Sequence, residues 1–151
     1  MVPEGIFDLA KIWEKEKPAR PVMVLVALEK MQTSSEEPQN VLNQLARSRA
    51  QLFVVSMEGG SGSTGNAANN MEMSGRAQVM GDGSKQSGGH RVEVAALTAF
   101  PKGLQAVADD LSSQYLITYT LPDGQKPSDR LSVSLKKKGA VLRAATKVSD
   151  R

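Results

Sequence analysis

Two apolar stretches decide the fold, Val22-Met23-Val24-Leu25-Val26-Ala27-Leu28 and Gln51-Leu52-Phe53-Val54-Val55-Ser56-Met57. Both are continuous apolar runs rather than alternating ones. This pattern is typical of strands that are covered on both faces in a parallel sheet. The sequence therefore predicts an α/β fold in which helices flank these two strands.

A helix is predicted before each of the two strands. Residues 5–17 carry apolar side chains at helical spacing and end before Pro18. The second helix begins after Ser34-Ser35-Glu36-Glu37-Pro38, which offers an N-cap, acidic side chains for the helix dipole and an early proline. Val41, Leu42 and Leu45 would form its apolar face. The order strand, helix, strand predicts a right-handed βαβ unit.

Residues 58–89 interrupt this pattern. They hold nine of the thirteen glycines of the chain together with several asparagines. Such a composition buries little apolar surface, so we expect a long flexible loop that a protease would cut first.

Regular structure is predicted again after residue 90. Residues 91–94 alternate as a short strand, and residues 104–111 have helical spacing with Thr98 or a neighbour as the cap. Strands are predicted at 114–120, 131–135 and 141–143, with turns at Pro122-Asp123-Gly124 and Lys138-Gly139. We therefore divide the chain into an α/β domain at 1–113 and an antiparallel β appendage with a basic tail at 114–151.

The net charge of +3 arises at the C-terminal end. Residues 126–151 hold eight basic and two acidic residues, a local charge of +6, so the rest of the chain sums to −3. A basic tail of this kind indicates an anionic partner as an alternative. The absence of cysteine and the single histidine exclude a disulfide framework and a Cys- or His-rich metal cage. No apolar run is long enough to span a membrane, and Met1-Val2-Pro3-Glu4-Gly5 does not begin a signal peptide.

Four groups of residues could carry chemistry. The segment Gly81–Gly89 is rich in glycine and contains Lys85, but it lacks the G-x-x-x-x-G-K-[ST] spacing of a phosphate loop. His90 would be the first general acid or base, yet no nucleophile is identifiable beside it, and we interpret it as a surface histidine. Asp109 and Asp110 point about 100° apart on a helix, so they cannot share a proton or a metal and are interpreted as solvated. Lys136-Lys137-Lys138 are interpreted as the charged edge of a hairpin.

The order of these segments resembles a known family. Arg20–Val26, Thr33-Ser34-Ser35 and Ala50–Val55 are similar to strands four and five of a von Willebrand factor A-type (VWA) domain with their helix. Ser87–Arg91, Ala106–Leu111, Gln114–Tyr119 and Leu131–Gly139 resemble the end of VWA-related proteins of acidobacteria. The resemblance covers residues 6–148 and implies the C-terminal half of a VWA domain followed by a β appendage. It also implies a secreted or periplasmic location.

The chain departs from this family at the metal site. VWA domains that bind a ligand through Mg²⁺ use a D-x-S-x-S loop, a threonine and an aspartate, which together supply hard oxygen ligands. No D-x-S-x-S occurs here, and the nearest match, Asp82-Gly83-Ser84-Lys85-Gln86, ends in the wrong residue. Glu29 is the one carboxylate near the end of the first strand. We therefore predict no metal site, no cofactor and no catalytic residue.

The resulting prediction is a non-catalytic protein-interaction module, the remnant of a VWA-type ligand-binding domain without a metal-ion-dependent adhesion site. A protein partner is expected, and the sheet edge left open by the missing half predicts self-association. Neither a small-molecule substrate nor a nucleic acid is expected. The alternative is a basic nucleic-acid-binding protein that uses the Lys/Arg-rich C-terminal tail, and the steep salt dependence of such binding would separate the two.

Overall fold

The computed structural model describes residues 2–28, 35–57, 67–118, 120–125, 128, 130 and 132–146, with the backbone alone for 67–74. Its elements, in chain order, are α1 (Val2–Glu16), β1 (Val22–Leu28), α2 (Pro38–Ser48), β2 (Gln51–Met57), α3 (Ala67–Gln86), β3 (Arg91–Val94), a short 3-10 helix η1 (Leu97–Ala99) and α4 (Phe100–Ser112). The α/β class predicted from the sequence is confirmed.

The three strands form a parallel sheet in the order β1-β2-β3. Val22 of β1 pairs with Gln51 of β2, and this register continues to the pair Leu28 and Met57. β3 pairs with the second half of β2, beginning at Arg91 opposite Val54. The βαβ unit and the strand at 91–94 are therefore confirmed, and β1 and β3 are the edges of the described sheet.

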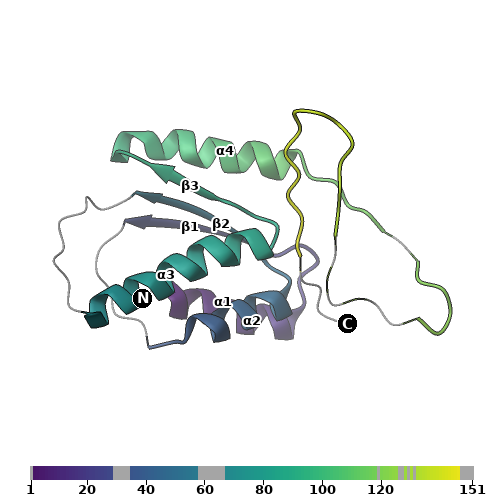
Figure 1. The fold of residues 1–151 in the computed structure, drawn as a ribbon, viewed down its shortest axis with the longest axis horizontal. Helices are drawn as coiled ribbons and strands as arrows, with labels where there is room; N and C mark the ends of the chain where they lie inside the picture. Colours follow the sequence, from purple (N-terminus) through teal and green to yellow (C-terminus); the bar gives the residue numbers. More distant parts are fainter. Residues whose placement is uncertain are drawn as a thin grey trace.

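Helices lie on both faces of the sheet, and each face has its own core (Figure 1). α1, α2 and α3 lie on one face and α4 on the other. The first core joins α1, α2 and α3 to alternate residues of β1 and β2, such as Met23, Leu52 and Val54. The second core is smaller and joins Phe53 and Val55 of β2 to Val94 and Val107. Because successive strand residues point to opposite faces, β2 is buried on both sides.

The starts of α2 and α4 differ from the caps that the sequence predicted. α2 begins after Glu37 without a side-chain cap and has Pro38 in its first turn, where the missing proline N–H costs nothing. Ser35 instead donates its backbone N–H to Glu4 of α1 at 2.7 Å. Ser34 lies outside the described residues. α4 begins after Ala99 with no side-chain cap, so the prediction for Thr98 was wrong.

Most of the described glycine-rich segment is a helix and not the loop that was predicted. Residues 58–66 lie outside the described part, but 67–86 form α3, so the prediction of a continuous loop was wrong there. Val79, Met80 and Ser84 of α3 are buried. A side chain added at Gly83 would meet Leu42, Leu45 and Leu52 at 3.2–3.4 Å. The glycine therefore lets α3 approach α2 and β2 closely, and this packing stabilises a helix that its own propensity disfavours.

The C-terminal appendage does not form the predicted antiparallel strands within its described residues. In residues 114–118, 120–125 and 132–146, Ala145 forms an antiparallel bridge with Ser87, and the rest is turn, bend or irregular chain. The two predicted turns are present, since Gly124 and Gly139 both have positive φ. Gln125 also donates its N–H to the Pro122 carbonyl at 3.1 Å. Alternation along the sequence indicated strands here, but alternation alone does not supply a pairing partner.

Candidate functional site

Three charged or titratable side chains meet beside the end of α4. The C-terminal segment, by which we mean the described residues of 114–146, passes this point. His90 lies just before β3, Asp110 in the last turn of α4, and Arg143 in the C-terminal segment. The Nη1 atom of Arg143 donates to both carboxylate oxygens of Asp110, at 2.8 and 3.1 Å. His90 Nδ1 approaches Asp110 Oδ2 at 2.9 Å. Asp110 therefore joins two segments that are far apart in the sequence.

His90 is a largely packed ring whose pKa is lowered by its surroundings. Its side chain is 17% exposed, and its ring meets Phe53 edge-on with centroids 5.5 Å apart. Burial lowers the pKa of His90 below 6.5, the neighbouring Arg143 lowers it further, and Asp110 opposes them by raising it. Nδ1 is buried and makes no hydrogen bond within the described residues, so its approach to Asp110 Oδ2 is a close contact without hydrogen-bond geometry.

Further bonds attach the C-terminal segment near the end of the sheet where β2 begins. Thr146 donates its N–H to the Gln86 carbonyl at 3.0 Å, beside the bridge between Ser87 and Ala145. Ser87 also accepts the Leu52 N–H through Oγ at 2.9 Å. The segment Gly81–Gly89, which was considered for phosphate binding, thus forms the end of α3 and a support for the C-terminal segment.

The lowered pKa of His90 predicts a loss of stability in acid. The unfolded chain takes up the proton as the pH falls through 6.5. The folded chain takes it up at lower pH, so the free energy of unfolding decreases below pH 6.5. Replacing His90 with Phe keeps an aromatic contact with Phe53 and removes this dependence. Urea unfolding of both proteins at about pH 7.5 and about pH 5.5 measures the difference. An equal loss of stability in His90→Phe would contradict this assignment.

Within the described part of the chain, β1 presents an exposed apolar face on the α4 side of the sheet. Val24 and Val26 pair in register with Phe53 and Val55, so these four side chains lie on the same face. Phe53 and Val55 are buried in the second core, whereas Val24, Val26 and Leu28 are 44%, 54% and 44% exposed. We call these three exposed residues of β1 the β1 strip. The prediction that this strand is covered on both faces was wrong, because α4 packs over β2 and β3.

The other predicted residues are not brought into one site. Asp109 is exposed and accepts a hydrogen bond from Gln105 at 2.8 Å, as expected for a solvated residue. Asp110 is partly exposed, and in addition it contacts Arg143 and His90, which the prediction of a solvated surface residue did not include. Lys136, Lys137 and Lys138 are exposed beside the turn at Gly139, without the hairpin that was predicted.

Nothing in the described residues assembles a metal site. Glu29 lies outside them, and the part of the chain that is placed contains no group of three or more His, Cys, Asp or Glu side chains able to hold an ion. Asp82, in the nearest match to the metal motif, is carried by α3. No described helix combines the length and apolarity needed to cross a bilayer.

Sequence reasoning missed the β1 strip and the role of Arg143. An apolar run that lacks alternation does not say which face a helix will leave open. Arg143 meets Asp110 across 33 residues, and neither position carries a local signal of the pairing.

Comparison with protein-family models, curated protein sequences and solved structures gave no match to this chain. The class that the fold defines is an α/β protein with a three-stranded parallel sheet and helices on both faces. The VWA resemblance stays a prediction.

Proposed function

We propose that the chain is a non-catalytic protein-interaction module, the remnant of a VWA-type binding domain without a metal-ion-dependent adhesion site. The observation that carries the proposal is the β1 strip. Three aliphatic side chains continue the α4-side core onto a strand that α4 does not cover. Covering them would contribute about 1 kcal/mol each, since each is half exposed.

The backbone of β1 supports the same conclusion. β1 is an edge strand that pairs with β2 on one side within the described sheet. Unpaired N–H and C=O groups at a sheet edge are ready to bond another extended segment. An added strand would satisfy these groups, and its own side chains on the α4 side would pack beside the β1 strip. The simplest such partner is a second copy of this chain, joined antiparallel through β1 so that each copy presents the same surface to the other.

A charge placed in the β1 strip tests this proposal. In Val26→Lys, one lysine must be desolvated in the contact, and a second lysine approaches it across the two-fold axis. We expect sedimentation to show the wild-type mass rising with concentration toward twice 16.2 kDa. We expect Val26→Lys to remain monomeric, with a dissociation constant at least roughly tenfold higher.

Ile12→Lys is the matched control, because Ile12 is 49% exposed on α1, which lies on the face of the sheet opposite the β1 strip. It should associate as the wild type does. Wild-type protein that stays monomeric at its highest soluble concentration would contradict the proposal, as would equal effects of the two lysine substitutions.

A further inference from the structure

A groove of about 750 Å³ lies at the end of the sheet where the strands begin. Its walls come from the ends of α1 and α2, the segment leading into β1, and the C-terminal segment. No residue of the β1 strip lines it, so it is a second surface. Arg20 donates to Gln114 at 2.7 Å and Gln114 donates to Gln51 at 2.8 Å, which fixes the C-terminal wall against the first residue of β2.

The described lining of the groove is strongly positive. Four cations line it, namely Lys17, Arg20, Arg47 and Arg49. Glu14 is the one carboxylate among the lining residues, and its Oε2 accepts a hydrogen bond from Gln44 at 2.7 Å. The lining therefore carries a charge of +4 − 1 = +3 and favours an anionic ligand.

Two of these cations occupy strained backbone positions. Lys17 has φ 50° and Arg49 has φ 58°, and they are the two non-glycine residues with positive φ in the described ranges. Each follows the last turn of a helix, α1 or α2, where glycine is the usual residue because it has no Cβ to clash. Here a long cationic side chain occupies each of these positions, and Lys17 and Arg49 both line the groove. Strain of this kind is characteristic of functional positions.

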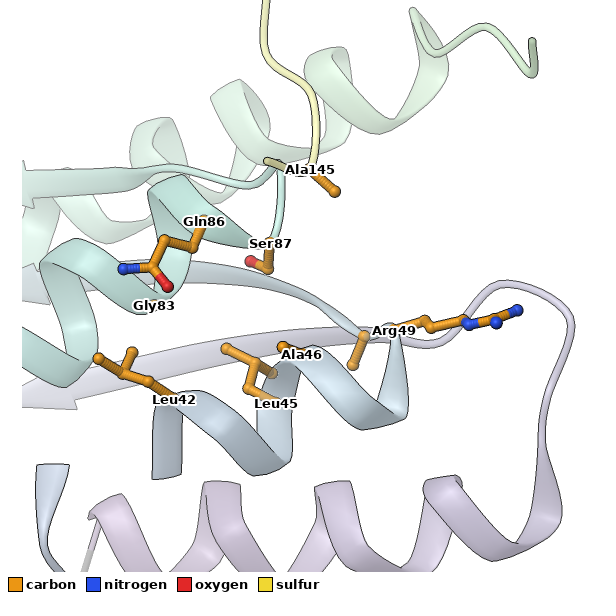
Figure 2. Close-up of a pocket in the computed structure, with 9 residues that line it drawn as sticks. Leu42, Leu45, Ala46, Arg49, Gly83, Gln86, Ser87 and Ala145 are labelled. Atoms are coloured by element: carbon orange, nitrogen blue, oxygen red, sulfur yellow. The ribbon is translucent and has the colours of Figure 1, made fainter. Parts of the chain in front are cut away.

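An apolar pocket continues from the groove. It has a volume of about 160 Å³ and lies between α2, the end of α3 and Ala145 of the C-terminal segment. Figure 2 shows Leu42, Leu45 and Ala46 along α2 on one side of this pocket, with Gln86 and Ser87 opposite. Arg49, Ser87 and Ala145 line both the pocket and the groove. A cavity of about 150 Å³ holds a benzene ring, so the pocket fits one large apolar side chain.

We propose that this groove binds an acidic peptide segment of a partner protein, with one apolar side chain of the peptide inserted into the pocket. The carboxylates would lie along Lys17, Arg20, Arg47 and Arg49, and Arg49 would stand where the charged and apolar parts of the ligand join. This interaction goes beyond the strand pairing proposed for β1, because it uses different residues and a ligand of different chemistry.

The pocket favours a peptide over a nucleic acid. Phosphates would also satisfy the cations, but a base inserted into the pocket would face Leu42, Leu45, Ala46 and Ala50. Base edges carry donors and acceptors that need hydrogen-bond partners, whereas a phenylalanine or leucine side chain does not.

The test uses a short fluorescein-labelled peptide of Glu and Asp residues around one central Phe, with fluorescence anisotropy as the readout. In the double variant Lys17→Gly, Arg49→Gly we expect binding to weaken roughly tenfold. The same variant should unfold at or above the wild-type temperature, because glycine adopts positive φ without strain. A purely structural role for these two cations would leave peptide binding unchanged, and that result would overturn the proposal.

Further measurements separate the contributions of the charged and the apolar parts of the ligand. A peptide with Ser in place of Phe should bind more weakly than the Phe peptide to the wild type. Ala46→Phe, which fills the pocket from α2, should remove this difference. Val26→Lys should bind the Phe peptide as the wild type does. Loss of peptide binding at the groove can therefore be distinguished from loss of self-association through β1. Tighter binding of an oligothymidylate than of the Phe peptide would overturn the proposal in favour of a nucleic acid.

Discussion

Gly89→Ala is expected to destabilise the fold by about 3 kcal/mol, one of the largest effects of any single methyl group in this protein. A Cβ at Gly89 would overlap the Leu52 carbonyl oxygen and lie 2.7 Å from its carbon. Both are backbone atoms of β2 and cannot rotate away. The neighbouring His90 carbonyl accepts the Val54 N–H at 3.0 Å, so movement of this segment would also break the start of the β2–β3 pairing.

Gly81→Ala is the matched control for this substitution. Gly81 lies in α3 with nothing within 4 Å of the added Cβ. The same chemical change should therefore stabilise the protein, by about 0.5–1 kcal/mol, because alanine favours helix more than glycine does. Urea unfolding measures both values. Equal effects of the two substitutions would contradict the close approach of Gly89 to β2.

Met80→Ala is expected to cost about 3 kcal/mol, and it tests the helix in the glycine-rich segment. Met80 is 1% exposed and belongs to the first core together with Val79. In a loop exposed to water the same substitution would change stability by less than about 0.5 kcal/mol.

Gln78→Ala provides the comparison for Met80→Ala, since Gln78 is exposed on the same helix. It should leave the urea midpoint nearly unchanged. Equal urea midpoints for Met80→Ala and the wild type would indicate that this segment is the loop predicted from its composition.

The sheet and its helices could be predicted where periodicity and burial agree. The apolar runs of β1 and β2 and the i, i+3, i+4 spacing of α4 are local patterns that required no knowledge of the tertiary structure. α3 could not be found in this way, because Gly75 and Gly83 oppose helix formation locally. They favour it in the fold by allowing close contact with Pro38 of α2 and with Leu42, Leu45 and Leu52.

The candidate surfaces depended still more on tertiary arrangement. The exposure of Val26 follows from the position of α4 over β2 and β3, and sequence alone does not fix that position. The groove brings Arg20, Arg49 and Tyr115 together from three separate segments. Composition placed the excess positive charge in the C-terminal tail, so the cations between residues 17 and 49 did not stand out.

Hydrogen exchange along β1 tests the central claim most directly, because it follows the edge strand itself. The amides of β1 that do not bond to β2 should exchange rapidly in dilute protein and more slowly as the concentration rises, while β3 shows no such change. In Val26→Lys the exchange of β1 should be independent of concentration. Concentration-independent exchange of β1 in the wild type, or protection that persists unchanged in Val26→Lys, would contradict the assignment of β1 as the contact surface.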